Sequence, residues 1–193
     1  MFKSKEKKFW DWFVKNQQSI EHFVDNMEDY SIYNELTKKL KDYHSELYPE
    51  VTKEGDTYEL IITPDGMKVG MEPTKKIVEK APFLKNWELF RFRQAKDDFG
   101  IEIEDVSLEL DSIKVLRFFR EEEVDIGVCI EDYDPENKSF HVAGFLMLDH
   151  ILGEFNVLTR VGAVEFYDWN AIKPEHETVS LLVLRKEIEE KLY

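Results

Sequence analysis

The stretch that most constrains the fold is Lys138–Trp169, where a nearly continuous apolar run is followed by a glycine and a second apolar run. The first run, residues 140–148, is too short for a membrane span and has polar flanks. It favours a strand covered on both faces, or a strand that leads into a buried helix. Asp149 is placed to cap a short helical turn, and Gly153 to end it. Residues 161–168 have apolar side chains on both alternating faces, which predicts a second interior strand and identifies no chemistry.

Two amphipathic helices are predicted before the strands. Residues 6–27 place their apolar side chains within one arc of about 200° at helical spacing. The residues of this arc are Phe9, Trp10, Trp12, Phe13, Val14, Ile20, Phe23, Val24 and Met27. This aromatic stripe favours packing on the chain's own sheet, with a groove for a partner as the alternative. Ser31–Glu46 repeats apolar residues every three or four positions and predicts the second helix, before Pro49.

Strands are predicted from residue 48 onward. Thr57–Thr63 is rich in β-branched and aromatic residues and follows a turn signal at residues 53–56. Trp87–Arg93 alternates as a further strand, and Pro73 opens a short helix between the two. The order hairpin, short helix, strand recurs from Ile113 to Trp169. We therefore expect two ββαβ-like units.

The segment Ile101–Ile130 has the alternation of an antiparallel sheet. A one-residue slip in that alternation indicates a β-bulge at Glu104-Asp105. Residues 124–130 form the cleanest strand. Glu175–Leu192 repeats apolar residues at helical spacing and predicts a final helix, although residues 178–184 also have the composition of a strand.

These patterns predict an α+β fold in a single domain, residues 1–193. N-terminal helices occupy residues 1–47, the first ββαβ-like unit residues 48–96, an acidic second unit residues 97–170 and a C-terminal helix residues 171–193. A mainly antiparallel sheet from the two units is packed by the two N-terminal helices and the C-terminal helix. The length of 193 residues and the 42% share of hydrophobic residues suffice for such a core.

The net negative charge of the chain comes entirely from its second half. Residues 97–193 hold 24 of the 41 acidic and 9 of the 26 basic side chains, which accounts for the whole net charge of −15. Within this half, Asp97–Glu136 has 15 acidic residues against Lys114, Arg117 and Arg120. Such a surface repels phosphate backbones, so nucleic acid is not an expected partner. The functional interpretation is a docking face for a basic protein, and the alternative is a face that only keeps the chain soluble.

A cytoplasmic location is the expectation. No window of eighteen apolar residues is present, so we expect no membrane span. Asp11 and Lys15 interrupt the aromatic cluster near the start, which argues against a secretory signal. The single cysteine, Cys129, excludes an internal disulfide.

The common catalytic signatures are absent, and no catalytic residue, metal or cofactor is predicted. The glycines never fall as G-x-G, no serine lies in G-x-S-x-G, and neither H-E-x-x-H nor a paired C-x-x-C is present. Residues 132–136 begin like a calcium loop, but Asn137 occupies the glycine position and Ala143 the final glutamate position. These absences exclude only the families that use those signatures.

Two smaller constellations favour structural roles. His150 and Glu154 lie one helical turn apart without a third ligand nearby, which predicts a surface pair. Cys129 shares a strand face with Asp125 and Glu131, whose negative charge is expected to raise the pKa of the thiol. A raised pKa argues against a thiolate nucleophile.

The candidate binding residues are Trp87, Arg91 and Arg93. On a strand their side chains share one face, with the two arginines about 7 Å apart. Two guanidinium groups beside an indole can hold a carboxylate or a phosphate. The alternative is that the arginines pair with Glu102 and Glu104 on a neighbouring strand.

Several spaced motifs occur together along residues 9–169. They are W-x-x-F-x-x-N (Trp10, Phe13, Asn16), D-G (Asp65, Gly66), A-P-x-L-x-x-W (Ala81, Pro82, Leu84, Trp87), F-R-x-R (Phe90, Arg91, Arg93) and L-D-x-x-L-G-E (Leu148, Asp149, Leu152, Gly153, Glu154). In this combination the chain resembles an uncharacterised family of small bacterial α+β proteins. It departs from that family at Phe92, where the family has proline. The resemblance implies a bacterial, soluble, single-domain protein and carries no known activity.

The sequence therefore predicts a non-catalytic intracellular protein-interaction module with an acidic face. An immunity or inhibitor role against a basic toxin or nuclease is one concrete version, because acidity speeds the capture of a basic partner. The alternative is a small-anion-binding protein or an enzyme that uses Arg91 and Arg93.

Overall fold

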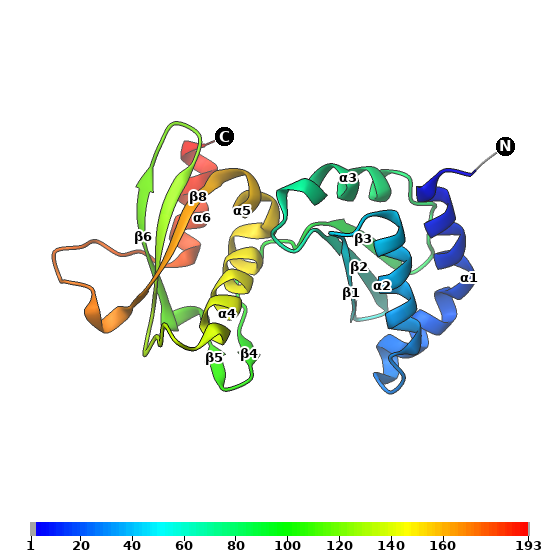
Figure 1. Ribbon diagram of the computed structural model, residues 1–193, viewed down its shortest axis with the longest axis horizontal. Coiled ribbons are helices and arrows are strands. Elements are labelled where there is room, and N and C mark those ends of the chain that lie inside the picture. The colour runs from blue at the N-terminus through cyan, green and yellow to red at the C-terminus, as the bar shows by residue number, and fades with distance from the viewer. Residues whose placement is uncertain (1–2, 193) are drawn as a thin grey trace. The chain divides into compact units, whose positions relative to one another are not determined.

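The chain divides into two compact units, Met1–Arg93 (unit 1) and Gln94–Tyr193 (unit 2), in a computed structural model that describes residues 3–192 (Figure 1). Each unit has its own sheet and its own hydrophobic core. The division lies three residues before the boundary expected between residues 96 and 97. The organisation as a single domain stays a prediction.

Unit 1 begins with two helices, α1 (Lys5–Asn26) and α2 (Ser31–Tyr43). The hydroxyl of Ser4 caps α1 by accepting a hydrogen bond from the amide of Lys7 at 3.2 Å. Met27 ends the helix in the left-handed conformation, with a φ of 54°. Both helices lie within two or three residues of their predicted bounds.

The sheet of unit 1 has the order β1-β2-β3, with β1 (Tyr48–Glu54), β2 (Thr57–Thr63) and β3 (Trp87–Arg91). Strands β1 and β2 form an antiparallel hairpin, whereas β3 runs parallel to β2. The crossover between them contains a short 3₁₀ turn, η1 (Lys68–Gly70), and the helix α3 (Met71–Glu79). All three helices and the sheet contribute to one core. This core contains Phe9, Trp10, Phe13, Ile20, Leu36, Leu40, Leu60, Ile62, Ile77 and Trp87. The aromatic stripe of α1 is thus mainly a core face, as predicted.

Unit 2 repeats this order with different additions. The central sheet has the order β6-β7-β8, with β6 (Ile113–Phe119) antiparallel to β7 (Val124–Ile130) and β8 (Val161–Asp168) parallel to β7. The crossover is one long helical segment of three parts: α4 (Lys138–Leu148), the π-helical turn η3 (Asp149–Gly153) and α5 (Glu154–Arg160). The two predicted ββαβ-like units and the α+β fold class are therefore confirmed. The strands, however, form a separate sheet in each unit and not one shared sheet, and each central sheet includes a parallel pair.

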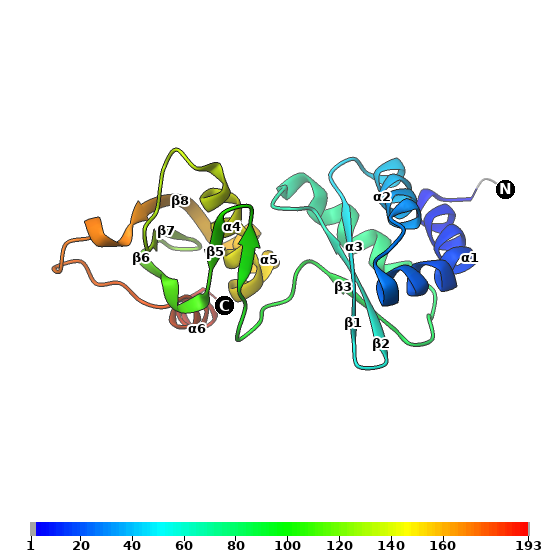
Figure 2. The same cartoon turned by 90° about the horizontal axis from the view of Figure 1, so that it is seen from below.

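The remaining elements of unit 2 cover its core. A separate hairpin of β4 (Ile101–Ile103) and β5 (Val106–Leu108) packs beside α4 (Figure 2). The short 3₁₀ turns η2 (Leu110–Ser112) and η4 (Trp169–Ala171) flank the sheet in sequence, and α6 (Leu181–Lys191) ends the described chain. The core includes Val106, Ile113, Val115, Val128, Ala143, Met147, Ile151, Leu181, Leu184 and Ile188.

The apolar run at residues 140–148 is a helix, so the predicted buried strand is wrong. A short continuous apolar run does not distinguish a buried strand from a buried helix. Here Ala143 and Met147 are spaced for one helical face and are fully buried in the core. Asp149 does not start a new helix, because the helix continues through it as the π turn. Gly153 has the expected positive φ, 83°, but α5 begins at the next residue.

Two further boundaries differ from the predictions. The expected bulge at Glu104-Asp105 is a two-residue hairpin turn, since Ile103 pairs with Val106 and Glu104 has a φ of 53°. The final helix begins at Leu181 rather than at residue 175. Val179 instead exchanges two backbone hydrogen bonds with Val115 of β6.

One helical segment, Lys138–Arg160, is long and apolar enough to cross a membrane by length and composition alone. Its most apolar window is 61% buried inside the protein. Because those side chains are used by the core of unit 2, this is the pattern of a core helix in a soluble protein.

An ion pair joins α6 to β6. The Arg117 Nε donates to the Glu187 Oε2 at 2.6 Å, and Lys191 lies 3.2 Å from the same carboxylate. The hydrogen bond from Arg117 holds the pKa of Glu187 below its ordinary value, against the opposing effect of burial. A carboxyl group whose pKa is lower in the folded state stabilises the fold above its unfolded pKa, and this contribution is lost as the pH falls through the folded pKa.

We therefore expect Glu187→Gln to lower the free energy of unfolding by about 1.5 kcal/mol at neutral pH. The difference from the wild type should shrink once the pH falls below 4.5, the ordinary pKa of the carboxyl group. Urea unfolding at several pH values measures both effects. Glu189→Gln, at an exposed position of the same helix, is the matched control. A difference that stays constant at all pH values would contradict this role of the ion pair.

Candidate functional site

Trp87, the first predicted binding residue, is part of the core of unit 1. Its indole N–H donates to the Glu21 Oε1 at 2.8 Å. Its ring stacks on Tyr58, with centroids 5.3 Å apart, and meets the edge of Phe13 at 5.1 Å. The ring is therefore packed in the core of unit 1, and its single N–H donor is bonded to a carboxylate of α1.

Arg91 and Arg93 do not share the regular face that the strand pattern predicts. Strand β3 ends at Arg91, and Phe92 has a φ of 67°, which takes Arg93 out of the alternation. The Nη1 of Arg91 lies 3.7 Å from the Oε1 of Glu79. Arg93 is only 5% exposed. An anion-binding role for Trp87, Arg91 and Arg93 stays a prediction.

The guanidinium group of Arg93 lies between two carboxylates of unit 1. Its Nε donates to the Glu50 Oε1 at 2.7 Å, and its Nη2 donates to the Asp65 Oδ1 at 2.8 Å. Two carboxylates beside one guanidinium offset its charge and occupy donors that an anionic ligand would need. This arrangement is typical of a structural ion pair.

The acidic residues of unit 2 gather at two places. Glu121–Glu123 form the turn between β6 and β7. At the opposite end of that hairpin, a larger group comes from the β4–β5 hairpin, the η2 turn and the loop after β7. We call this group the acidic end: Glu102, Glu104, Asp105, Glu109, Asp111, Glu131, Asp132, Asp134 and Glu136, all of which are exposed. The face predicted from residues 97–136 is thus divided between two ends of the sheet.

Hydrogen bonds hold the segments of the acidic end together. The Asn137 Nδ2 donates to the Asp105 Oδ1 at 3.1 Å, and the Ser139 hydroxyl donates to the Glu104 carboxylate at 2.7 Å. The amide of Glu131 donates to the carbonyl of Ser112 at 3.2 Å. Segments 19 to 35 residues apart in sequence therefore present their carboxylates on one surface.

The carboxylates of the acidic end have no internal counter-ions. In the described chain, residues 3–192, none of the nine lies within 4 Å of a lysine, arginine or histidine nitrogen. Asp97 and Asp125 of unit 2 are paired with Arg185 and Arg120, whereas Glu121–Glu123 form no ion pair with any described residue. The acidic end is thus the larger of the two groups of unpaired carboxylates in the described part of unit 2.

A small groove of about 260 Å³ lies within the acidic end. The acidic residues Asp105, Glu131 and Asp132 line it with the hydroxyl-bearing residues Ser107 and Ser112, and no cationic residue lines it. Carboxylate and hydroxyl oxygens accept hydrogen bonds from ammonium and guanidinium groups. The described residues contain no cluster of histidine, cysteine, aspartate and glutamate able to hold a metal ion. The groove therefore suits an organic cation.

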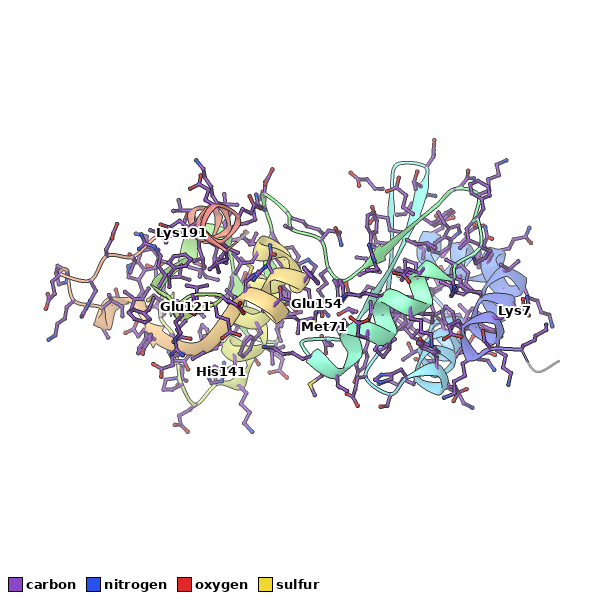
Figure 3. All side chains as sticks on the ribbon, turned by 90° about the horizontal axis from the view of Figure 1, so that it is seen from above. Lys7, Met71, Glu121, His141, Glu154 and Lys191 are labelled. Atoms are coloured by element: carbon purple, nitrogen blue, oxygen red, sulfur yellow. The ribbon has the colours of Figure 1, made fainter. Side chains whose placement is uncertain are left out.

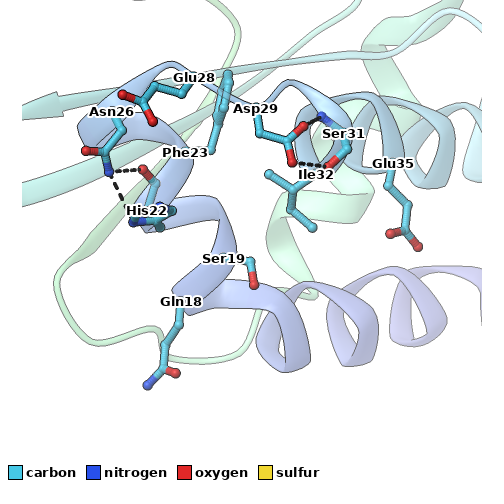
Figure 4. A pocket seen from close by; sticks show the side chains of 10 residues that line it. All are labelled: Gln18, Ser19, His22, Phe23, Asn26, Glu28, Asp29, Ser31, Ile32 and Glu35. Carbon is cyan, nitrogen blue, oxygen red and sulfur yellow. Dashed lines mark hydrogen bonds between the residues drawn. The ribbon is translucent and has the colours of Figure 1, made fainter.

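A second cleft, of about 520 Å³, lies between α1 and α2 (Figure 4). Its polar groups mostly serve the ends of the helices. Asp29 accepts from the amide and the hydroxyl of Ser31, and Asn26 donates to the carbonyl of His22 at 2.7 Å. The Glu35 Oε1 accepts from the indole of Trp12 at 2.9 Å. The polar side chains that line the cleft therefore cap the helices or bond to neighbouring side chains.

The π turn and the residue that follows it carry buried acidic groups that the sequence reasoning missed. Glu154, which is labelled in Figure 3, is the first residue of α5. Its side chain is fully buried, and that of Asp149 is nearly so. The predicted surface pair of His150 and Glu154 is therefore wrong, and the His150 ring instead stacks on Phe99 at 4.0 Å. The available signal was the position of both carboxylates within the apolar stretch FLMLDHILGEF. A buried carboxylate needs hydrogen-bonding partners, and π turns are frequent at functional sites.

Cys129 is fully buried in β7. Burial raises the pKa of its thiol. The direction agrees with the prediction, but the cause is loss of solvent rather than the neighbouring carboxylates. A buried thiol with a raised pKa is a poor nucleophile.

Comparison with known protein families, with curated proteins and with solved structures finds no match. The resemblance to the uncharacterised bacterial family therefore stays a prediction.

Proposed function

We propose that this protein is a non-catalytic, intracellular binding module that captures a basic protein through the acidic end of unit 2. The observation that carries the proposal is the group of nine exposed carboxylates without an internal counter-ion. Uncompensated charge of one sign concentrates oppositely charged partners and raises association rates. Inhibition of a basic toxin or nuclease, as an immunity protein would do, is one concrete form of this role.

The groove at the acidic end supplies a place for a contact residue. An arginine or lysine of the partner would direct its cationic group to Asp105, Glu131 and Asp132, while Val106 and Phe140 meet its aliphatic stem. Arginine is enriched among the residues that dominate binding energy at interfaces. The acidic end thus offers both long-range attraction and a short-range acceptor.

The alternative, a small-anion site or an enzyme at Arg91 and Arg93, is less well supported. The charge of Arg93 is already shared between Glu50 and Asp65. An incoming carboxylate or phosphate would have to displace these groups.

Two triple variants with the same change of charge test the proposal. The acidic-end variant is Asp105→Asn/Glu131→Gln/Asp132→Asn, and the control is Glu121→Gln/Glu122→Gln/Glu123→Gln at the other end of the hairpin. With a small basic globular protein such as cytochrome c as the probe, stopped-flow kinetics at low salt should show association slowed about 10-fold by the first. The control should differ from the wild type by less than about twofold, and high salt should remove the difference.

The same two variants identify a physiological partner. A basic protein retained from the native cell extract by the wild type and the control, but lost from the acidic-end variant, would support the proposal. Equal slowing by both triple variants would show that the charge acts only as a diffuse field. No differential retention in the extract would show that the acidic end serves solubility.

A further inference from the structure

A cavity of about 660 Å³ lies in unit 1 between the first half of α1 and the end of α3. Trp10 and Val14 form the wall on the α1 side, and Pro82 adds an apolar surface after α3. The indole N–H of Trp10 donates to the carbonyl of Ile77 at 2.8 Å, so its only polar atom is already bonded. Val14 is 49% exposed although it is apolar. Trp10 belongs to the core of unit 1 and is only 3% exposed, so the hydrocarbon surface that the core does not use comes mainly from Val14 and Pro82.

Lysines surround this apolar surface. Lys7 of α1, labelled in Figure 3, and Lys76 and Lys80 of α3 and its C-cap line the cavity. Lys76 lies 3.5 Å from Glu6, and Lys7 lies 2.8 Å from Asp11. Lys80 forms no ion pair with any residue that the structure describes. One ammonium group at the cavity is therefore left for a ligand.

The two acidic residues of the lining are already satisfied. Asp11 accepts from both Lys3 and Lys7, and these bonds lower its pKa. Glu6 is nearly buried, and hydrogen bonds from its own backbone and from Ser4 lower its pKa. With Lys3 included, four lysines face two carboxylates, so the surroundings of the cavity are net positive. This local sign is opposite to that of the whole chain.

We propose that this cavity binds a small amphiphilic carboxylate, with its apolar body against Val14 and Pro82 and its carboxylate on Lys80 and Lys76. The volume lies within the range of small-molecule sites, which are mostly apolar with a few placed polar groups. Lysine serves as a flexible point charge for such an anion. This site is in unit 1 and does not depend on the role proposed for the acidic end.

Three probes separate the contributions of charge and hydrocarbon. Isothermal titration of the full chain with octanoate should show saturable binding. Acetate, which has the charge without the chain, and octanol, which has the chain without the charge, should each bind at least about 10-fold more weakly. Octanol binding as tightly as octanoate would overturn the ionic half of the proposal. Absence of saturable octanoate binding at millimolar concentration would overturn the whole.

Variants locate the site. Lys80→Gln and Val14→Asp are at exposed positions and should each weaken octanoate binding about 10-fold without a change in the circular dichroism spectrum. Lys8→Gln, an exposed lysine of α1 outside the cavity lining, makes the same change of charge as Lys80→Gln and should leave the affinity unchanged. Equal weakening by Lys8→Gln and Lys80→Gln would mean nonspecific attraction and would overturn the assignment.

Discussion

Phe13→Ala is expected to lower the free energy of unfolding by about 4 kcal/mol. The side chain is fully buried, and its ring contacts the rings of Phe9, Trp10 and Trp87 at centroid distances of 5.1–6.3 Å. Truncation removes this contact area and leaves a cavity between α1 and β3 that the surrounding rings cannot fill without leaving their packing. Chemical denaturation followed by tryptophan fluorescence and circular dichroism measures the loss.

The matched control for this variant is the next residue of the same helix. Val14 is half exposed, and Val14→Ala should change the free energy of unfolding by no more than about 0.5 kcal/mol. Adjacent positions on one helix would then differ by several kcal/mol because they face opposite environments. A similar small effect of both changes would show that α1 does not form the core of unit 1.

Gly144→Ala is expected to destabilise the protein by about 2 kcal/mol, although alanine is the better helix former. A methyl group built on Gly144 would lie 2.4 Å from the Phe166 Cε1, and real Cβ atoms do not approach a ring so closely. The missing side chain at Gly144 lets the ring of Phe166, on β8, lie against the backbone of α4. The clash should therefore outweigh the gain of up to about 1 kcal/mol in helix propensity.

A double-mutant cycle tests the cause. Phe166→Leu removes the ring atoms that meet the new methyl group, so Gly144→Ala should cost less in the Phe166→Leu background than in the wild type. Urea unfolding of the four proteins gives the coupling between the two sites. Additive effects would show that the cost of Gly144→Ala comes from elsewhere in α4.

The sequence predicts the overall charge of a segment, but it does not predict which charges are paired or where they meet in space, as the acidic end and the lysine-lined cavity illustrate. The excess of acidic residues in the second half is a property of the sequence. The sequence does not show which of these acids are paired, because Arg117, Arg120 and Arg185 reach particular carboxylates only in the folded unit. The cavity had no sequence signal, because Trp10 and Lys76 are 66 positions apart and meet only when α3 packs on α1.

The local sequence determined most elements outside the longest apolar stretch. The β-branched and aromatic composition of residues 57–63 placed β2. The alternation of residues 124–130 placed β7, and the aromatic arc of residues 9–27 placed α1, because such a strand or an amphipathic helix carries its burial pattern in its own spacing. The repeated order of hairpin, helix and strand was readable for the same reason. Tertiary structure alone decided that residues 140–148 form a helix, since Val142 and Phe145 on its exposed side are as apolar as Ala143 and Met147 on its buried side, which hides the helical period in the sequence. It also decided that Glu154 is buried and that Arg93 lies between Glu50 and Asp65, because such contacts depend on segments that the folded chain brings together.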